Sequence, residues 1–400
     1  MTKTGDVTPP LAIAGAGIGG LTAALALQRQ GHEVVVLDRA EQLSEVGAGL
    51  QLSPNACSVL DELGLLGTLE PFAYSPDCLQ IRSGKSGDLL AKVQLGNYLK
   101  QRHGHPYWVV HRADLQGALL KRVQETPGIT VQLGAEVTDL ASTSFDNLSC
   151  TYMQGGQKQS LSCRALIGAD GVWSKTRRLI PDHGNAKFSG QVAYRATIPV
   201  EKVPPRWTGD SGLWLHQASH LVHYQIRGGK ELNIVALARE DWQDETWSAP
   251  ADKTALLHLF KDWPADVRNL LALPDRWLKW ALCSVAGDGP WTHGHVALLG
   301  DAAHAMLPFM AQGAAMAIED AAILARHLPA SVDNIPAALR AYERQRKPRA
   351  TRIQGRSFQN AKTFHMSGLP GFARDTVLRL SSPRSLSAKF DDIYGWKPAG

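Results

Sequence analysis

Hydrophobic and polar positions follow a strand–helix–strand pattern at the N-terminal end of the chain. The apolar run Leu11–Ala14 predicts a buried strand. Leu21–Gln30 has apolar residues at helical spacing and predicts a helix, with Gly31 at the position where helices commonly end. Glu33–Leu37 is again mostly apolar and predicts a second strand, which ends on Asp38. This order predicts a βαβ unit with parallel strands.

The same α/β pattern returns further along the chain. Ser53 and Pro54 predict the start of a helix, and His111–Gln124 and a long segment from Gly313 also have helical spacing. Further strands are expected at 129–133, 135–140, 148–153, 160–163, 165–167 and 296–299.

Between Gln191 and Asp288 the pattern changes to short alternating segments separated by Pro and Gly turns. Such a pattern predicts an antiparallel sheet, and Tyr74–Gln101 has strand-like pieces that suit the same sheet. Tryptophans are concentrated here, and in a sheet they are more often core than site: Trp207, Trp214, Trp242, Trp247, Trp263, Trp277 and Trp280.

A basic helical stretch, Ala337–Gly355, follows this α/β region. Pro348 lies inside it and is expected to kink or interrupt the helix. Its cations are expected to form a solvated face: Arg344, Arg346, Lys347, Arg349 and Arg352.

Together these segments predict an α/β protein with a Rossmann-type domain, an inserted antiparallel-sheet lobe and C-terminal helices. The expected discontinuous dinucleotide-binding domain comprises 1–75, 104–183 and 289–335, the sheet lobe 76–103 and 184–288, and the C-terminal helical segment 336–400.

Composition narrows the functional classes. The formal net charge of +5 is too small and dispersed to indicate a nucleic-acid partner. The five cysteines form no C-x-x-C pair, which is typical of a reducing, cytosolic setting. The start of the chain has no apolar signal core, and no run is long and apolar enough for a transmembrane segment. A soluble, cytoplasmic protein is therefore expected.

The βαβ unit carries a G-x-G-x-x-G motif at Gly15, Gly17 and Gly20. The first glycine permits a tight turn, the second lets a pyrophosphate approach the backbone, and the third lets the helix pack closely on the strand. The helix N-terminus offers N–H groups and a partial positive charge to phosphates. Asp38, at the end of the second strand, can accept hydrogen bonds from a ribose. The motif predicts a dinucleotide site, which is FAD or NAD on this evidence.

Three further stretches have the composition of ligand-binding loops. Gly47–Leu52 (GAGLQL) suits close approach to a flat ring, although it can also be a plain turn. Gly168–Arg178 and Gly300–Gly313 each follow an apolar strand with a glycine–aspartate loop, in which Asp170 and Asp301 lie. Arg112, at a helix start, suits either a phosphate or flavin contact or a surface position.

The three motifs GAGIGG, GADGVWSKTR and GDAAHAMLPFMAQGAAMAIEDA, in this order, resemble the class A single-component flavoprotein aromatic hydroxylases. The chain is most similar to the branch that acts on salicylate, 3-hydroxybenzoate and 6-hydroxynicotinate, and the resemblance extends nearly to the basic helix. It implies a glutathione-reductase-like FAD-binding domain and three reactants: NAD(P)H, O₂ and a small phenolic acid. In this family NAD(P)H reduces FAD, and a flavin C4a-hydroperoxide hydroxylates the ring.

The resemblance also implies roles for individual residues. The FAD pyrophosphate would lie on Gly15, Gly17 and Gly20, and its ribityl chain on Asp301. The other implied cofactor contacts are Asp38, Arg39 and Val137 at the adenosine end, Arg112 and Gln51 at the flavin, Asp170 for FAD and the nicotinamide, and the backbone of Gly313, Ala314 and Ala315 at the flavin pyrimidine. Pro308 would contact the substrate. Ala311 stands where the family commonly has glycine, and no consequence is expected because backbone groups make the contacts.

The segment HLVHYQI supplies the catalytic hypothesis. On a strand, His220 and Tyr224 share one face, whereas His223 points to the other. A histidine beside a tyrosine can position and deprotonate a phenol, and related hydroxylases have a comparable pair. Both residues can equally be ordinary sheet residues. Gln51 stands where nicotinate-type enzymes have a histidine, which disfavours a nicotinate substrate.

Two other functions fit the same motifs. One is a reductase, dehydrogenase or epoxidase that acts on another apolar substrate. The other is a flavin-binding regulatory protein without turnover. The sequence does not choose the aromatic substrate, decide between NADH and NADPH, or set the oligomeric state, for which a homodimer is one expectation.

Overall fold

The computed structural model describes residues 8–43, 49–142, 148–242 and 248–398. Part of the glycine-rich stretch at Gly47–Leu52 lies outside these ranges, as does Trp247. The remainder of that stretch forms β3 (Gly49–Leu52), which pairs antiparallel with β6 (Trp108–His111).

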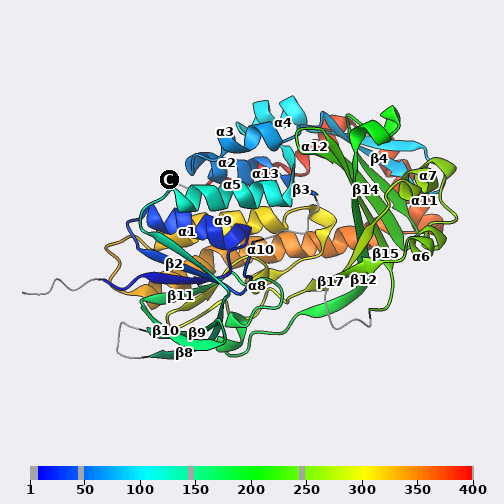
Figure 1. Cartoon of the computed structure of the whole chain (residues 1–400). Helices are drawn as coiled ribbons and strands as arrows, with labels where there is room; N and C mark the ends of the chain where they lie inside the picture. The colour runs from blue at the N-terminus through cyan, green and yellow to red at the C-terminus, as the bar shows by residue number, and fades with distance from the viewer. Residues whose placement is uncertain (1–7, 44–48, 143–147, 243–247, 399–400) are drawn as a thin grey trace, which may run out of the picture.

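A six-stranded sheet with strand order β18-β19-β11-β1-β2-β7 lies at one end of the molecule, on the left in Figure 1. The predicted βαβ unit is confirmed, because β1 and β2 are parallel neighbours joined through α1 (Ile18–Gln28). All pairs are parallel except β18–β19. The strands are β1 (Leu11–Ala14), β2 (Val34–Asp38), β7 (Ile129–Leu133), β11 (Ala165–Gly168), β18 (Thr292–His293) and β19 (Val296–Leu298).

Helices and a small sheet enclose this central sheet. α1 packs between α5 (Arg112–Gln124) and α9 (Gly313–His327), which buries the apolar faces of all three helices. A three-stranded antiparallel sheet lies on the opposite side in Figure 1 and comprises β8 (Ala135–Ser142), β9 (Leu148–Gln154) and β10 (Gln157–Cys163). The outer layer above α9 contains α2 (Pro54–Glu62), α3 (Leu66–Leu69) and α4 (Gly96–His103).

The alternating segments form an eight-stranded sheet with the order β16-β17-β12-β15-β14-β13-β4-β5. Two strands that precede Gly168 in the chain, β4 and β5, join this sheet, as expected for Tyr74–Gln101. The strands are β4 (Cys78–Ser83), β5 (Leu89–Gln94), β12 (Lys187–Pro199), β13 (Ser211–His216), β14 (Ser219–Ile226), β15 (Glu231–Arg239), β16 (Ser248–Ala251) and β17 (Trp277–Ser284).

The face of this sheet that carries the tryptophans has its own core. α6 (Lys253–Leu259) and α7 (Ala265–Ala272) cover this core, in which Trp207, Trp214, Trp263 and Trp277 are buried. The expectation that these tryptophans are core residues is confirmed. The other face of the sheet is turned toward the six-stranded sheet and its helices, and it lines one of the cavities described below.

α10 (Ile335–Phe364) differs from the sequence prediction in two respects. It continues for 30 residues through Pro348, so the expected interruption is wrong, whereas the expected kink stays a prediction. Pro348 is exposed, so water can satisfy the carbonyl that lacks a helical partner. The predicted solvated face is also wrong in part, because Arg346 is buried and the Arg349 side chain is only 10% exposed. Buried carboxylates on α9 compensate both charges, which the helical pattern alone could not reveal.

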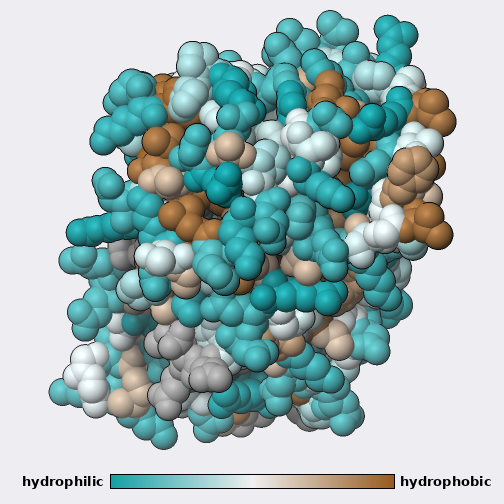
Figure 2. Space-filling model, turned by 90° about the vertical axis from the view of Figure 1, so that its right-hand side faces the viewer, coloured by the Kyte–Doolittle hydropathy of each residue, from teal (hydrophilic) through white to brown (hydrophobic). Residues whose placement is uncertain are grey.

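The C-terminal region continues with α11 (Gly368–Leu380), α12 (Pro383–Ala388) and α13 (Asp391–Tyr394). Figure 2 shows the end of the molecule formed by the eight-stranded sheet and its helices, which is mostly hydrophilic with separate apolar patches. Among the described residues, no helix combines the length and apolar character that a membrane crossing requires.

Candidate active site

Two adjoining cavities lie at the ends of β1 and β2 of the six-stranded sheet, and the second also reaches the eight-stranded sheet. The first, of about 290 Å³, lies beside the glycine-rich turn, and the second, of about 300 Å³, extends to β14. Gly17, Arg112, Ala169 and Gly171 line both, so the two spaces are continuous. An elongated ligand that reaches from the end of β1 to the eight-stranded sheet therefore has room to bind.

The glycine motif has the local geometry that the sequence predicts. Gly15 has a φ of +105°, and a Cβ there would lie 2.5 Å from the carbonyl oxygen of Ala169. A Cβ on Gly20 would lie 1.9 Å from the oxygen of Gly15, so only glycine lets α1 begin so close to β1. At Gly17 a Cβ would meet nothing within 4 Å, because this position opens to the cavity.

Three expected contacts of the adenosine end, Asp38, Arg39 and Val137, all line the first cavity. The Asp38 carboxylate also holds the turn, since it accepts hydrogen bonds from the N–H of Ala16 at 2.6 Å and of Ala40 at 2.8 Å. Each carboxylate oxygen retains a lone pair for a ligand hydroxyl.

Asp170 also lines the first cavity, but its carboxylate is largely committed to its own loop. It accepts hydrogen bonds from the Ser174 hydroxyl at 2.5 Å, the Lys175 N–H at 2.8 Å, and both the N–H and the hydroxyl of Thr176. These bonds fix the loop after β11, and through it Gly171, which faces both cavities. The geometry therefore gives Asp170 a supporting position beside the ligand space.

Five of the residues expected near the flavin and substrate line the second cavity: Gln51, Asp301, Pro308, Gly313 and Ala314. Ala315 is fully buried and is not among the lining residues, so the expected contact of its backbone with the flavin stays a prediction. Each helical residue is rotated by about 100° from the one before, so the third residue of α9 turns into the core. Asp301 is exposed and begins α8 (Asp301–His304) after Gly300, whose φ is +58°.

Ala311, at the turn before α9, has consequences that we did not expect from the sequence. It has a φ of +51°, in the left-handed region that favours glycine. A side chain in this conformation costs about 1 kcal/mol, so the usual glycine would be less strained here. The following residue, Gln312, is buried and begins α9.

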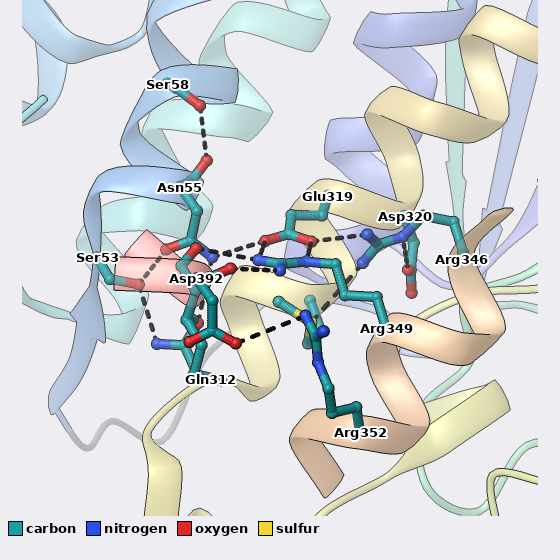
Figure 3. Close-up of polar contacts among 12 residues, drawn as sticks. Ser53, Asn55, Ser58, Gln312, Glu319, Asp320, Arg346, Arg349, Arg352 and Asp392 are labelled. Atoms are coloured by element: carbon teal, nitrogen blue, oxygen red, sulfur yellow. Dashed lines mark hydrogen bonds and ion pairs between the residues drawn. The ribbon is translucent and has the colours of Figure 1, made fainter. Parts of the chain in front are cut away.

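A buried polar network, which the sequence analysis missed, fixes the start of α9 (Figure 3). Gln312 donates to the Ser53 hydroxyl at 2.9 Å and accepts from the Asn55 amide at 3.2 Å. Asn55 also donates to Glu319 at 2.7 Å. The predicted cap Ser53 makes no capping hydrogen bond to its own helix, because its hydroxyl donates to Asn55 Oδ1. The network ties the N-terminus of α2 to that of α9.

The network continues into two charged residues on α9. Glu319 contacts Arg346 and Arg349 at 2.7 Å, and Asp320 contacts Arg346 at 2.8 Å. Asp320 also accepts from His304 Nε2 at 2.6 Å and from the N–H of Gly300 at 2.9 Å. Burial alone would raise the pKa of Asp320, but His304 and Arg346 lower it to about 2. Asp320 therefore holds both Gly300 and His304, the residues at the two ends of the short segment that contains Asp301.

His220 and Tyr224 both line the second cavity, as do the first residues of α9. His223 lies on the other face of β14, against Trp207, so the predicted alternation is confirmed. His220 is 2% exposed, and burial lowers its pKa well below the usual value. Burial likewise raises the pKa of Tyr224. Both side chains are therefore neutral near pH 7.

Arg195 on β12 is a cavity residue that the sequence analysis did not single out. It lines the second cavity, and its guanidinium carbon lies 5.3 Å from the centroid of the Trp280 ring. The positive charge lies close enough to Tyr224 to lower the pKa of that phenol in part. Alternation along VAYRATI could have placed Arg195 on one sheet face, but not in the same cavity as a histidine from another strand.

Comparisons of sequence and fold with known proteins identify the family. A family model described as an FAD binding domain matches residues 8–357. A 3-hydroxybenzoate 6-hydroxylase of Aquipseudomonas alcaligenes is 35% identical over 386 residues, which cover 96% of each chain. A 3-amino-4-hydroxybenzoate 2-monooxygenase of Streptomyces platensis is 34% identical over 399 residues, which cover 99% of this chain and 97% of the relative.

Solved structures show the same fold. A salicylate hydroxylase substrate complex has 25% identity and a TM-score of 0.80, with coverage of 97% of this chain and 96% of the other. Klebsiella pneumoniae HpxO, complexed with FAD and uric acid, has 24% identity, a TM-score of 0.83 and 96% coverage of both chains. The continuous cavity, its glycine turn and the open backbone at Gly17 and Gly313 fit FAD. The chain therefore belongs to the class A FAD-dependent aromatic hydroxylases and is an FAD-dependent monooxygenase.

Proposed function

We propose that this enzyme uses NAD(P)H and O₂ to hydroxylate a small phenolic carboxylic acid. The observation that carries the proposal is the second cavity, which His220, Tyr224 and Arg195 line together with the first residues of α9. These groups offer a proton acceptor, a phenolic hydroxyl and a cation to one ligand. The two relatives named above act on hydroxybenzoates, which have the matching phenol and carboxylate.

FAD, when bound, supplies electron transfer from NAD(P)H and activation of O₂. Gly15, Gly17 and Gly20 would hold its pyrophosphate, and Asp38, Arg39 and Val137 its adenosine end. Arg112 and Gln51 would contact the flavin, and Asp170 would support the loop where FAD and the nicotinamide meet. The backbone of Gly313 and Ala314 would face the flavin pyrimidine, where the helix N-terminus stabilises negative charge by about 1 kcal/mol.

The substrate would lie between this helix N-terminus and β14, with Pro308 at its edge. Arg195 would bind the carboxylate and Tyr224 would orient the ring. His220 would accept the phenol proton, because a phenolate is a better nucleophile in ring hydroxylation. The apolar walls of the cavity, Val222 and Leu237 among them, would exclude water from the reacting atoms.

The experiment that tests this proposal is NAD(P)H oxidation by the purified holoenzyme with a panel of hydroxybenzoates, combined with product analysis. We expect at least one hydroxybenzoate to stimulate NADH or NADPH oxidation and to yield a product with one added oxygen. Stimulated oxidation that releases only hydrogen peroxide with every phenol, or turnover only of a non-aromatic substrate, would contradict the proposal.

Replacement of Asp301 by alanine is expected to weaken FAD binding by about tenfold or more. A carboxylate that accepts hydrogen bonds from ribityl hydroxyls contributes roughly 1.5–3 kcal/mol per bond. FAD retention during dialysis and titration of the apoprotein measure the effect. Asp333→Ala, at another aspartate in a loop, is the matched control. Wild-type FAD affinity in a folded Asp301→Ala protein would remove Asp301 from the cofactor site.

Arg195→Met is expected to raise KM for a hydroxybenzoate substrate by about 10- to 100-fold, since charged hydrogen bonds contribute roughly 1.5–3 kcal/mol. A phenol with the same ring but without the carboxylate should show a much smaller change. Steady-state kinetics with both compounds give this comparison. Equal losses for the two compounds would mean that Arg195 acts through the fold of β12 and not on the carboxylate.

A further inference from the structure

The residue that follows α10 contacts His220, the proposed catalytic histidine. This residue is His365, the C-cap of the helix, and its Nε2 lies 2.9 Å from Nδ1 of His220. Phe309 packs against both imidazoles, with ring centroids 4.9 Å from His220 and 5.7 Å from His365. His220 is buried, whereas His365 is partly exposed. The pair therefore extends from the second cavity toward the surface.

A second element holds His365 in this position. Arg374 on α11 donates hydrogen bonds to the carbonyl oxygens of Thr363 at 3.0 Å and Phe364 at 2.8 Å. These carbonyls belong to the last turn of α10, which has no further helical donors. Asp375 pairs with Arg374 at 2.8 Å. Arg374 thus anchors the C-terminal end of α10 and, with it, the position of His365 beside His220.

The surroundings disfavour a positive charge on either ring. Burial, together with His365, lowers the pKa of His220 well below its usual value. Burial, with Arg239 on β15 and Arg374 on α11, lowers the pKa of His365 to about 4. Because the charged imidazolium is disfavoured here, His220 can accept a proton on one ring nitrogen only if the proton on its other ring nitrogen leaves at the same time. The geometry provides an acceptor for that proton at 2.9 Å.

We propose that His365 is a proton-transfer and positioning residue for His220, and that it connects the buried end of the substrate cavity to solvent. This inference rests on the proposed role of His220 in substrate deprotonation. His220 Nδ1 is engaged by His365, so Nε2 is the nitrogen that faces a substrate hydroxyl.

The transfer conserves charge on both imidazoles. The phenol O–H proton moves to His220 Nε2, the proton on His220 Nδ1 moves to His365 Nε2, and the proton on His365 Nδ1 passes to water. The substrate becomes a phenolate, and both rings remain neutral in their other tautomers. Proton return along the same path after the reaction restores the starting tautomers.

The test measures phenol ionisation directly, without turnover. The chromophoric probe 3-hydroxy-4-nitrobenzoate is mixed with oxidised holoenzyme, and phenolate absorbance is followed by stopped flow over a range of pH. We expect His365→Gln to slow ionisation by about tenfold or more, since positioned proton transfer contributes factors of this size. The dissociation constant of the ionised probe should remain unchanged. His327→Gln, at an exposed histidine on α9, is the matched control.

A second variant separates proton transfer from packing. His365→Ala should also slow ionisation, and added imidazole should restore part of the rate. Failure of imidazole to restore it, together with weaker probe binding, would overturn the proposal in favour of packing. If the probe ionises at the wild-type rate in His365→Gln but slowly in His220→Gln, the proton-transfer role of His365 is refuted and that of His220 is retained. Wild-type ionisation in both variants would instead refute the role of His220.

Discussion

Replacement of His220 by glutamine is expected to slow substrate hydroxylation by about 10²- to 10⁴-fold, the usual contribution of a positioned acid or base. The side chain lines the second cavity, and its Nδ1 contacts His365, so in our proposal Nε2 accepts the phenol proton. Without phenolate formation the ring is a poor nucleophile. Glutamine retains polar atoms of similar reach but cannot accept and pass on a proton.

The loss should be largest in the reaction of the reduced enzyme with O₂, because phenolate character matters when the ring is hydroxylated. Flavin reduction and FAD content should remain close to those of the wild type. More NAD(P)H should be consumed per product, with hydrogen peroxide released. Tyr224→Phe should be milder and should act mainly on substrate affinity.

His216→Gln is the control for this experiment, since His216 lies in the same sheet but faces Trp263 outside the cavity. Normal rate and coupling in His220→Gln would mean that His220 is a packing residue of β14. His223 would not replace it as the base, because it lies on the opposite face of the strand.

Replacement of Arg346 by methionine is expected to lower the free energy of unfolding by about 3–5 kcal/mol, the usual cost of removing one partner from a buried ion pair. Arg346 is 1% exposed and contacts the fully buried Glu319 and Asp320. After its removal Arg349 still compensates Glu319, but Asp320 retains only His304 and the N–H of Gly300.

Chemical denaturation of the holoenzyme measures this loss, and Arg344→Met on the exposed face of the same helix should change stability little. Because Asp320 anchors Gly300 beside Asp301, Arg346→Met should also release FAD more readily than the wild type. A stability loss below about 1 kcal/mol would show that water or a neighbouring group replaces the guanidinium.

The ion pair between Arg346 and Asp320 also predicts that the stability of the fold depends on pH. The folded pKa of Asp320 is lowered to about 2, below its value in the unfolded chain. Its contribution is therefore complete above about pH 4 and is lost as the pH falls toward 2. Arg346→Met should reduce this acid-dependent part of the stability, which denaturation at about pH 2.5 and at pH 7 can resolve.

Local sequence patterns were sufficient wherever neighbours in the chain decide the structure. The βαβ unit follows from apolar periodicity and from three glycines. Gly15 and Gly20 leave no room for a Cβ, and the backbone at Gly17 is open to a ligand. Strand alternation placed His220 and Tyr224 on one face and His223 on the other. The α/β class, the antiparallel sheet and the family were therefore predictable from the sequence.

Charge pairing across the fold was not predictable in this way. The arginines of α10 have the spacing of an exposed basic face, yet Arg346 meets two carboxylates that lie far away in the sequence. The periodicity of a single helix contains no information about the charge of the helix packed against it. For the same reason Asn55 and Gln312, which are unremarkable as residue types, were not identified as the link between α2 and α9.

The sequence by itself determined the glycine turn, the order of the elements and the two faces of β14, because each depends on backbone geometry and residue spacing over short distances. Only the tertiary structure placed Arg195 of β12 in the cavity that His220 lines and brought His365, which follows α10, into contact with His220. It also turned Ala315 into the core and gave Ala311 a left-handed backbone. These features depend on how distant segments pack, and packing fixes side-chain partners that no local pattern contains.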